Sequence, residues 1–184
     1  MSHNFSFTIY TVAKPFYGDF DQIQRNAILS WTKICPRPNI VIFGSEYGTA
    51  KFAEEIGAQH VPALAKTAYD SPDLVNLLQR ADAFVSTELK AFVCSDLILP
   101  PTFAKSLFLT QDRFSKFVMF GRAPELSVPE WGSLFLENHP DKFANICQLA
   151  SGRSIQSTPA RYFAYNHNPW NDLPPLALGG IYWH

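Results

Sequence analysis

Charged residues are scarce in this chain, and neither sign predominates. Lys, Arg, Asp and Glu make up 17% of the 184 residues, and the formal net charge is -1 at pH 7. Nucleic-acid-binding domains usually carry a basic patch, and attraction to an anionic membrane surface needs clustered Lys or Arg. The scattered basic residues therefore argue against both nucleic acid and a membrane surface as partners.

Cysteine is also rare, and long apolar runs are missing. Cys35, Cys94 and Cys147 have no metal-ligand spacing, and each lies in or beside an apolar segment, which predicts buried free thiols instead of disulfides. A membrane-spanning helix needs about 18 consecutive apolar residues, and the sequence has no such run. The first residues lack the basic start and apolar core of a signal peptide. A cytoplasmic protein is the expectation that follows.

The common phosphate-binding and hydrolase motifs do not occur either. The sequence contains neither G-x-x-x-x-G-K-[ST] nor G-x-G-x-x-G. The segment from Gly44 to Gly48 has Glu46 at its centre, so it is not a nucleophile elbow. No two histidines have ligand spacing. Nucleotide binding through a P-loop or a dinucleotide fingerprint is therefore excluded.

What the chain does contain is an alternation of short apolar segments and helical periodicity. Strands are predicted over residues 7–12, 39–43, 58–61, 91–99, 116–120 and 161–165. Helices are predicted over 19–34, with Asp19 as N-cap, over 47–56 and over 101–109, and one begins at Ser71-Pro72 with an apolar stripe that reaches Leu89. Further helices are predicted after Ser127 and Pro140. This order predicts one α/β domain over residues 1–184, a mostly parallel sheet with helices on both faces.

Polar residues gather where the predicted strands end. Lys14 follows the first strand, Gly44-Ser45-Glu46 the second, and Gly121-Arg122 a later one. Asp96 is the single carboxylate in the apolar run from Ala91 to Leu99. A buried charge needs a partner, solvent or a metal, so Asp96 either binds a cation that carries a phosphorylated substrate or caps the turn after the strand. Ligands of open α/β sheets bind beyond the carboxyl ends of strands, which places the predicted site here.

Several short sequence segments, spread in order along nearly the whole chain, together match the pattern of a known protein family. They include Lys14-Pro15-Phe16 after the first strand, Gln24-Arg25-Asn26-Ala27-Ile28, residues 42–48, residues 92–99, residues 117–122, and residues 161–165 followed by 173–179. This ordered set resembles the small glycosyltransferase-like proteins of the GT-A, nucleotide-diphospho-sugar transferase fold. The resemblance implies a glycosyltransferase that moves a sugar from a nucleotide-diphospho-sugar to a hydroxyl of a glycan or another acceptor.

The resemblance also implies roles for individual residues. Asp96 would bridge Mn²⁺ or Mg²⁺ to the diphosphate, and Asp172 or Glu125 would act as the catalytic base. The remaining implied donor-binding residues are Thr11, Val12, Ala13, Lys14, Arg25, Gly44, Glu46, Ser95 and Arg122. Arg25 reaches phosphate or base, or is a helix-surface charge. Glu46 accepts a hydrogen bond from a pyrimidine base, or is a turn carboxylate. Arg122 supports the phosphates, or forms a salt bridge.

Two departures from the pattern keep other functions open. Cys94 stands where the metal motif usually has an acidic residue, and hard cations prefer oxygen to thiol. Relatives continue past Gly179 through a Trp-rich segment, whereas this chain ends at His184, which predicts truncation on the acceptor side or an impaired relative. The alternatives are a nucleotide-binding module that has lost catalysis and a nucleotidyltransferase on a similar sheet.

Overall fold

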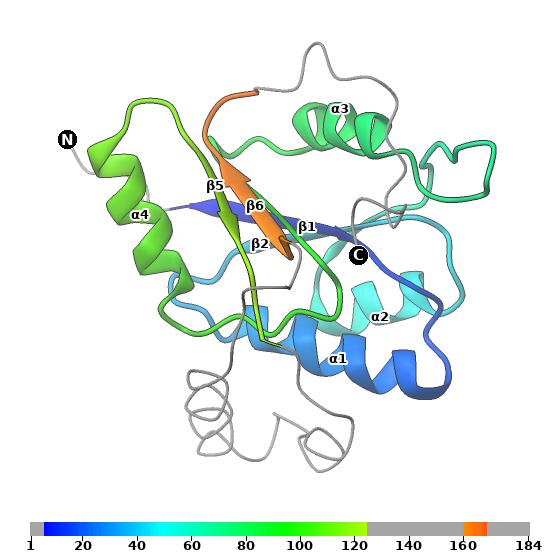
Figure 1. Cartoon of the computed structure of the whole chain (residues 1–184). Helices are drawn as coiled ribbons and strands as arrows, with labels where there is room; N and C mark the ends of the chain where they lie inside the picture. Colours follow the sequence, from blue (N-terminus) through cyan, green and yellow to red (C-terminus); the bar gives the residue numbers. More distant parts are fainter. Residues whose placement is uncertain (1–5, 125–159, 169–184) are drawn as a thin grey trace.

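The computed structural model describes residues 6–124 and 160–168, which form an α/β arrangement around one sheet (Figure 1). The sheet has six strands in the order β3-β2-β1-β4-β6-β5. The strands are β1 (Phe7–Val12), β2 (Asn39–Phe43), β3 (Gln59–Val61), β4 (Leu89–Val93), β5 (Val118–Gly121) and β6 (Tyr162–Tyr165). The helices are α1 (Gly18–Thr32), α2 (Thr49–Ile56), α3 (Leu74–Phe84) and α4 (Phe103–Arg113).

The sheet is mostly parallel, with one reversed strand. β3, β2, β1 and β4 pair in parallel, and Val12 lies opposite Phe43 where β1 and β2 end. β6 is inserted between β4 and β5 and runs antiparallel to both. The amino end of β6 therefore lies at the same edge of the sheet as the carboxyl ends of β1, β2 and β4.

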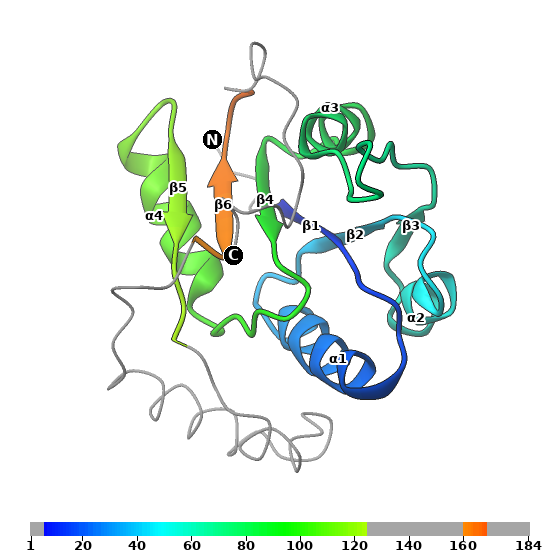
Figure 2. The ribbon, with the colours of Figure 1, turned by 45° about the vertical axis from the view of Figure 1, so that its right-hand side comes forward.

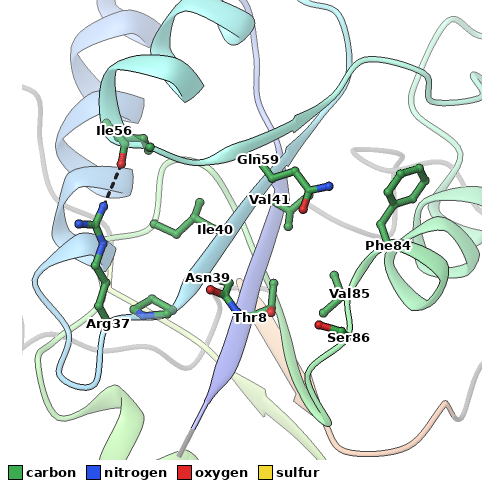
Figure 3. Close-up of a pocket in the computed structure, with 12 residues that line it drawn as sticks. Thr8, Arg37, Asn39, Ile40, Val41, Ile56, Gln59, Phe84, Val85 and Ser86 are labelled. Atoms are coloured by element: carbon green, nitrogen blue, oxygen red, sulfur yellow. Dashed lines mark hydrogen bonds between the residues drawn. The ribbon is translucent and has the colours of Figure 1, made fainter.

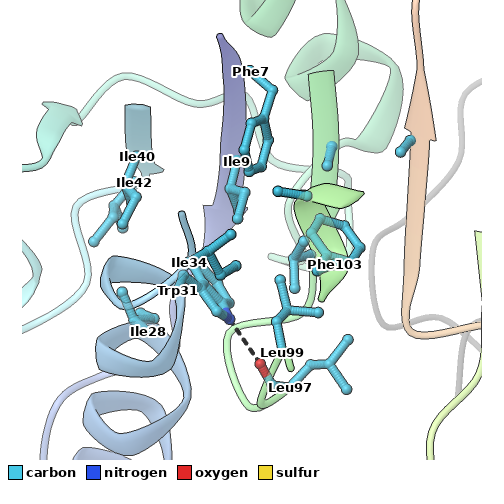
Figure 4. Close-up of a cluster of buried hydrophobic side chains, with 14 of the residues drawn as sticks. Phe7, Ile9, Ile28, Trp31, Ile34, Ile40, Ile42, Leu97, Leu99 and Phe103 are labelled. Atoms are coloured by element: carbon cyan, nitrogen blue, oxygen red, sulfur yellow. Dashed lines mark hydrogen bonds between the residues drawn. The ribbon is translucent and has the colours of Figure 1, made fainter. Parts of the chain in front are cut away.

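Helices cover both faces of the sheet, and each face has its own apolar core. Side chains from α1, α2 and α4 pack on one face against alternate residues of the strands, such as Ile9 and Ile42 (Figure 4). Side chains of α3 pack on the other face against the intervening residues, such as Val41 and Phe92. Figure 2 shows α3 on the side opposite to α1 and α2. This confirms the predicted α/β class with helices on both faces.

Several predicted elements need correction at their ends. α1 has Tyr17 as its N-cap, without a side-chain hydrogen bond, and Asp19 lies inside its first turn. α3 is capped by Asp73, whose carboxylate accepts from the backbone N–H groups of Val75 and Asn76. The apolar stripe attributed to this helix does not continue to Leu89, which is the first residue of β4. The stripe crosses the boundary because a buried strand start is as apolar as a helix face.

Two other expectations were wrong in part. Cys35 is an exposed free thiol, whereas Cys94 is a half-buried one, and Cys147 lies outside the described residues, as do the predicted helices after Ser127 and Pro140. β4 ends at Val93, so Asp96 does not interrupt a buried strand but lies in the turn that follows it. No helix of the described ranges is long and apolar enough to cross a membrane.

Candidate functional site

Two cavities of about 490 Å³ lie at opposite ends of the parallel strands. Figure 3 shows the one at the amino end of β2, lined by Asn39, Thr8 and Gln59 among others. Its Arg37 donates from Nη2 to the carbonyl oxygen of Ile56 at 2.8 Å. The described residues that line it include no carboxylate, histidine or cysteine, so it offers no acid or base for catalysis.

The second cavity, here called the strand-end cavity, lies at the carboxyl ends of β1, β2 and β4. Its walls come from the residues after these strands and from the residues that lead into β6. They are completed by Phe20, Ile23 and Gln24 of α1 and by Pro62, Leu64, Lys66 and Pro72. Its charged lining residues, within the described part of the chain, are Lys14, Glu46, Lys66, Asp96 and Arg161. The position is the one expected for a ligand of an open α/β sheet.

Asp96 and Arg161 form an ion pair on one wall of this cavity. Arg161 Nη2 lies 2.5 Å from Asp96 Oδ2, and both side chains are about one-third exposed, at 29% and 39%. The Arg161 carbonyl accepts from the Cys94 N–H at 3.0 Å, and the Arg161 N–H donates to the Gly121 carbonyl at 2.7 Å. These backbone bonds extend the ladder on both sides of β6, so Arg161 is fixed between the ends of β4 and β5.

Cys94 precedes Asp96 along the chain and is half-buried. Burial raises the pKa of its thiol to about 11, the first of several causes, and the positive charge of Arg161 opposes the rise. The group is therefore a neutral thiol near neutral pH. A thiol is in any case a poor ligand for Mn²⁺ or Mg²⁺, which prefer oxygen.

The residues around Asp96 do not fit a site for Mn²⁺ or Mg²⁺. Such cations need several oxygen ligands, and the described residues contain no group of three or more His, Cys, Asp or Glu side chains placed to hold one. Oδ2 of Asp96 is paired with Arg161, and Oδ1 is shielded from solvent without a hydrogen-bond partner among the described residues. A cation in the cavity would have to displace Arg161 or rotate the carboxylate.

The loop after β1 is held by a buried side chain of α1. Gln24 Oε1 accepts from the Lys14 N–H at 2.7 Å, and Gln24 Nε2 donates to the Lys14 carbonyl at 3.0 Å. Gln24 is completely buried. Its amide bonds both the N–H and the carbonyl of Lys14, as a paired residue of a neighbouring strand would, and so fixes the backbone at the cavity wall. Lys14 itself is exposed, and its Nζ lies 4.5 Å from the centre of the Phe20 ring.

The turn after β2 forms another wall. Gly44 has φ +100°, a conformation that favours glycine, and its N–H donates to the Val61 carbonyl at 3.0 Å. His60 Nε2 donates to the Gly44 carbonyl at 2.8 Å. Glu46 then faces Lys66, with 3.6 Å between its Oε1 and Nζ of the lysine. These bonds hold the turn between the ends of β2 and β3.

The structure brings most of the predicted donor-binding residues together and leaves others apart. Those that line the strand-end cavity are Val12, Ala13, Lys14, Gly44, Glu46, Ser95 and Asp96. Thr11 is buried in β1 and is not part of the lining. Arg122 is exposed beyond β5, also outside the lining. The predicted catalytic candidates Glu125 and Asp172 lie outside the described residues.

Arg25 has the environment of a helix-surface charge. Its Nε lies 2.8 Å from Asp21 Oδ1 and its Nη1 2.6 Å from Glu55 Oε2. Its guanidinium also lies over the Phe52 ring, 4.7 Å from the centroid. These contacts connect α1 to α2, and Arg25 is not in the cavity lining.

Three residues of the site were missed by sequence reasoning. Gln24 was part of a segment that carries the resemblance but had no predicted role, because its burial and its bonds to Lys14 depend on the tertiary structure. Lys66 has no local signal, because its position at the cavity depends on tertiary contacts. Arg161 had one available signal, because it is the first residue of the strand predicted over 161–165. Only the antiparallel direction of that strand brings its amino end to the cavity.

The fold is similar to that of solved nucleotide-sugar transferases. Glucosyl-3-phosphoglycerate synthase from Mycobacterium tuberculosis, in complex with Mn²⁺, uridine diphosphate and phosphoglyceric acid, aligns with a TM-score of 0.50 and 16% identity. The alignment covers 88% of this chain and 55% of that one. S. aureus TarS, residues 1–349, aligns with a TM-score of 0.49 and 15% identity over 66% of this chain and 39% of that one. No family model matches the sequence, and no curated protein matches it.

At this level of identity the likeness is one of fold. The chain has a nucleotide-sugar transferase-like α/β fold of the GT-A kind, as the sequence predicted. It spans about half the length of the synthase structure that it matches.

Proposed function

We propose that this chain is a glycosyltransferase domain that binds a nucleotide-diphospho-sugar in the strand-end cavity. The observation that carries the proposal is the position of this cavity, at the carboxyl ends of β1, β2 and β4 in a transferase-like fold. Its volume of about 490 Å³ lies within the usual range for small-molecule sites. Basic side chains on separate walls, Lys14, Lys66 and Arg161, match the negative charge of a diphosphate.

Each wall of the cavity suits a part of such a donor. The Gln24-held backbone of Val12 to Lys14 would run along the nucleoside, and Glu46 would accept a hydrogen bond from its base. Gly44 and Ser95 provide small surfaces for close approach of the ligand. Arg161 and Lys14 would contact the phosphates. Asp96 stays the residue predicted to contact a cation, although its surroundings do not fit one.

The acceptor side rests on residues beyond those described. Asp172 and Glu125 remain the candidates for the base that takes the proton from the acceptor hydroxyl. The synthase structure contains uridine diphosphate and phosphoglyceric acid. For this chain a uridine nucleotide sugar is therefore the first donor to test, together with a set of hydroxyl acceptors.

The test compares donor binding with product formation. Nucleotide sugars are titrated against the protein by calorimetry, and transfer to an acceptor mixture is followed by mass spectrometry. Lys14→Glu reverses a charge at the cavity and should weaken donor binding about tenfold. Lys105→Glu makes the same change on the exposed surface of α4 and should leave binding as in the parent. Equal donor affinity in the Lys14→Glu and Lys105→Glu variants would mean that the donor does not bind in the strand-end cavity.

A second candidate is a nucleotide-binding module that has lost catalysis. Cys94 in the place of an acidic residue and the ion pair of Asp96 with Arg161 favour it, because both reduce the oxygen ligands offered to a cation. Tight donor binding without transfer to any acceptor would support this candidate. Release of pyrophosphate from a nucleoside triphosphate and a sugar phosphate would instead indicate the third alternative, a nucleotidyltransferase.

A further inference from the structure

We infer that the strand-end cavity neutralises the diphosphate of its donor with the guanidinium of Arg161, in the place where a divalent cation would otherwise act. The inference rests on the proposed function, because it concerns the same cavity and the same class of ligand. Asp96, the position predicted for a metal ligand, is paired with an arginine and follows the half-buried thiol of Cys94.

The placement of Arg161 is fixed before any ligand binds. Its N–H and carbonyl are both used in backbone hydrogen bonds, to Gly121 and Cys94. Its side chain is held by Asp96, is 29% exposed and lines the strand-end cavity. The residue therefore faces the ligand space while its backbone is fixed. Guanidinium groups bind phosphates through two parallel hydrogen bonds. A pre-positioned guanidinium loses little freedom when a diphosphate binds.

The charges of the cavity favour an anion over a cation. The lining side chains among the described residues include three basic groups, Lys14, Lys66 and Arg161, and two acidic ones, Glu46 and Asp96. Asp96 pairs with Arg161, and Lys66 pairs with Asp70 at 3.1 Å and with Glu46 at 3.6 Å. Lys14 is therefore the basic lining residue that forms no ion pair among the described residues. A site for a free divalent cation is instead expected to carry surplus carboxylates. Asp96 in this arrangement is a positioning residue that orients Arg161.

Arg161 would act on the leaving group during sugar transfer. The acceptor oxygen forms a bond to the anomeric carbon of the sugar and gives its proton to a base. The bond from that carbon to the diphosphate oxygen breaks, and its electron pair stays on the nucleoside diphosphate that leaves. The negative charge of the diphosphate grows in this step, and a fixed cation beside it stabilises the transition state.

The first experiment measures binding with and without metal. The parent protein is titrated by calorimetry with uridine, cytidine, guanosine and adenosine diphosphates, once in EDTA and once with Mn²⁺, and Mn²⁺ alone is titrated in a separate run. We expect at least one nucleoside diphosphate to bind in EDTA with an affinity that Mn²⁺ does not improve. We expect no binding of Mn²⁺ alone.

The second experiment changes the ion pair. Arg161→Gln should weaken binding of that nucleoside diphosphate in EDTA about tenfold, and Arg161→Lys by less, because it keeps the charge and loses the planar fork. Arg113→Gln, on the exposed end of α4, is the matched control. Asp96→Asn keeps an oxygen that accepts from Arg161 and removes a negative charge from the cavity. It should therefore bind the diphosphate more tightly than the parent does.

The outcomes separate this inference from the proposed function. If the nucleoside diphosphate binds only with Mn²⁺ and Asp96→Asn abolishes that binding, Asp96 is a metal ligand. The inference is then wrong, while the donor site stands. Unchanged affinity in a folded Arg161→Gln variant, judged by circular dichroism and melting temperature, also overturns the inference. If no nucleoside diphosphate or nucleotide sugar binds under either condition, the proposed function fails and the inference fails with it.

Discussion

At the scale of single residues, the two described thiols are in contrasting environments. Cys35 is exposed, whereas burial raises the pKa of Cys94 to about 11. Thiolate is the reactive form of cysteine. We therefore expect maleimide at about pH 8 to label Cys35 quickly and Cys94 slowly in the folded protein, with the Cys94 rate rising as the pH approaches its pKa. Peptide mapping by mass spectrometry separates the two sites.

The raised pKa of Cys94 also makes the stability of the fold depend on pH, and stability should fall as the pH becomes alkaline. The folded protein favours the neutral thiol of Cys94, so this group stabilises the fold below the pKa of an unfolded cysteine, about 8.5. That contribution is lost as the pH rises above this value. Cys94→Ala should show a weaker loss of stability with alkaline pH than the parent does. Labelling of Cys94 as fast as Cys35 would contradict the burial of its thiol.

At the scale of elements, two tyrosines connect strands that are not neighbours. Tyr10 of β1 and Tyr165 of β6 are both completely buried, and their hydroxyls lie 3.1 Å apart across β4. Burial, followed by the effect of Tyr165, raises the pKa of Tyr10 well above its usual value. Tyr10 therefore stays neutral and shares a hydrogen bond with Tyr165 within the α3-side core.

We expect the losses in the free energy of unfolding from Tyr10→Phe and Tyr165→Phe to be non-additive. Tyr10→Phe or Tyr165→Phe alone removes the hydrogen bond between the two buried hydroxyls, at a cost of about 1–2 kcal/mol each. The double variant removes both hydroxyls, so its loss should be smaller than the sum of the single losses. Urea denaturation of the four proteins measures this coupling, with Tyr17→Phe, at an exposed tyrosine, as control. Strictly additive losses would show that the two hydroxyls do not interact.

The contact between β5 and β6 depends on a glycine. Gly121 lies opposite Tyr162 in the register, and a Cβ at this position would lie 1.8 Å from Cε1 of the tyrosine ring. The φ angle of Gly121 is not in the left-handed region. Space for the ring is therefore the reason for glycine here, and Tyr162 in turn lines the strand-end cavity.

Gly121→Ala should therefore disturb both stability and the cavity. The tyrosine ring must move, which we expect to destabilise the fold by about 1–3 kcal/mol and to weaken nucleotide binding. Thermal and urea denaturation measure the first effect, and calorimetry the second. In a Tyr162→Ala background the same substitution should be nearly neutral. An equal loss in both backgrounds would mean that the alanine acts on the backbone and not on the ring.

At the scale of the whole molecule, charge sets the class of partner. The net charge is -1, and the basic residues of the strand-end cavity are balanced in part by Glu46 and Asp96. We expect no retention of single-stranded or duplex nucleic acid in a gel-shift assay at about 0.15 M salt, because such binding depends on several phosphate contacts to basic residues. A saturable shift that weakens steeply with added salt would contradict this expectation.

Much of the fold was predictable because its signals are local. β1 and β2 have the bounds that their β-branched and apolar residues predicted. α2 ends at Ile56, and Gly57 caps it in the left-handed conformation that glycine adopts readily. The end of α3 was not predictable from periodicity. Val85 and Leu89 continue its apolar pattern although they belong to the following turn and strand.

By itself, the sequence determined the order of strands and helices, the edge of the sheet where polar residues collect, and the resemblance to a fold. Hydrophobic periodicity and turn residues act over a few neighbours along the chain, which is why these features can be read without a structure. The tertiary structure decided which charges meet. Arg25 is drawn to Asp21 and Glu55, away from the cavity. Arg161 reaches Asp96 because β6 runs antiparallel beside β4. An ion pair between distant segments depends on strand order and direction, and neither is encoded in the spacing of the two residues.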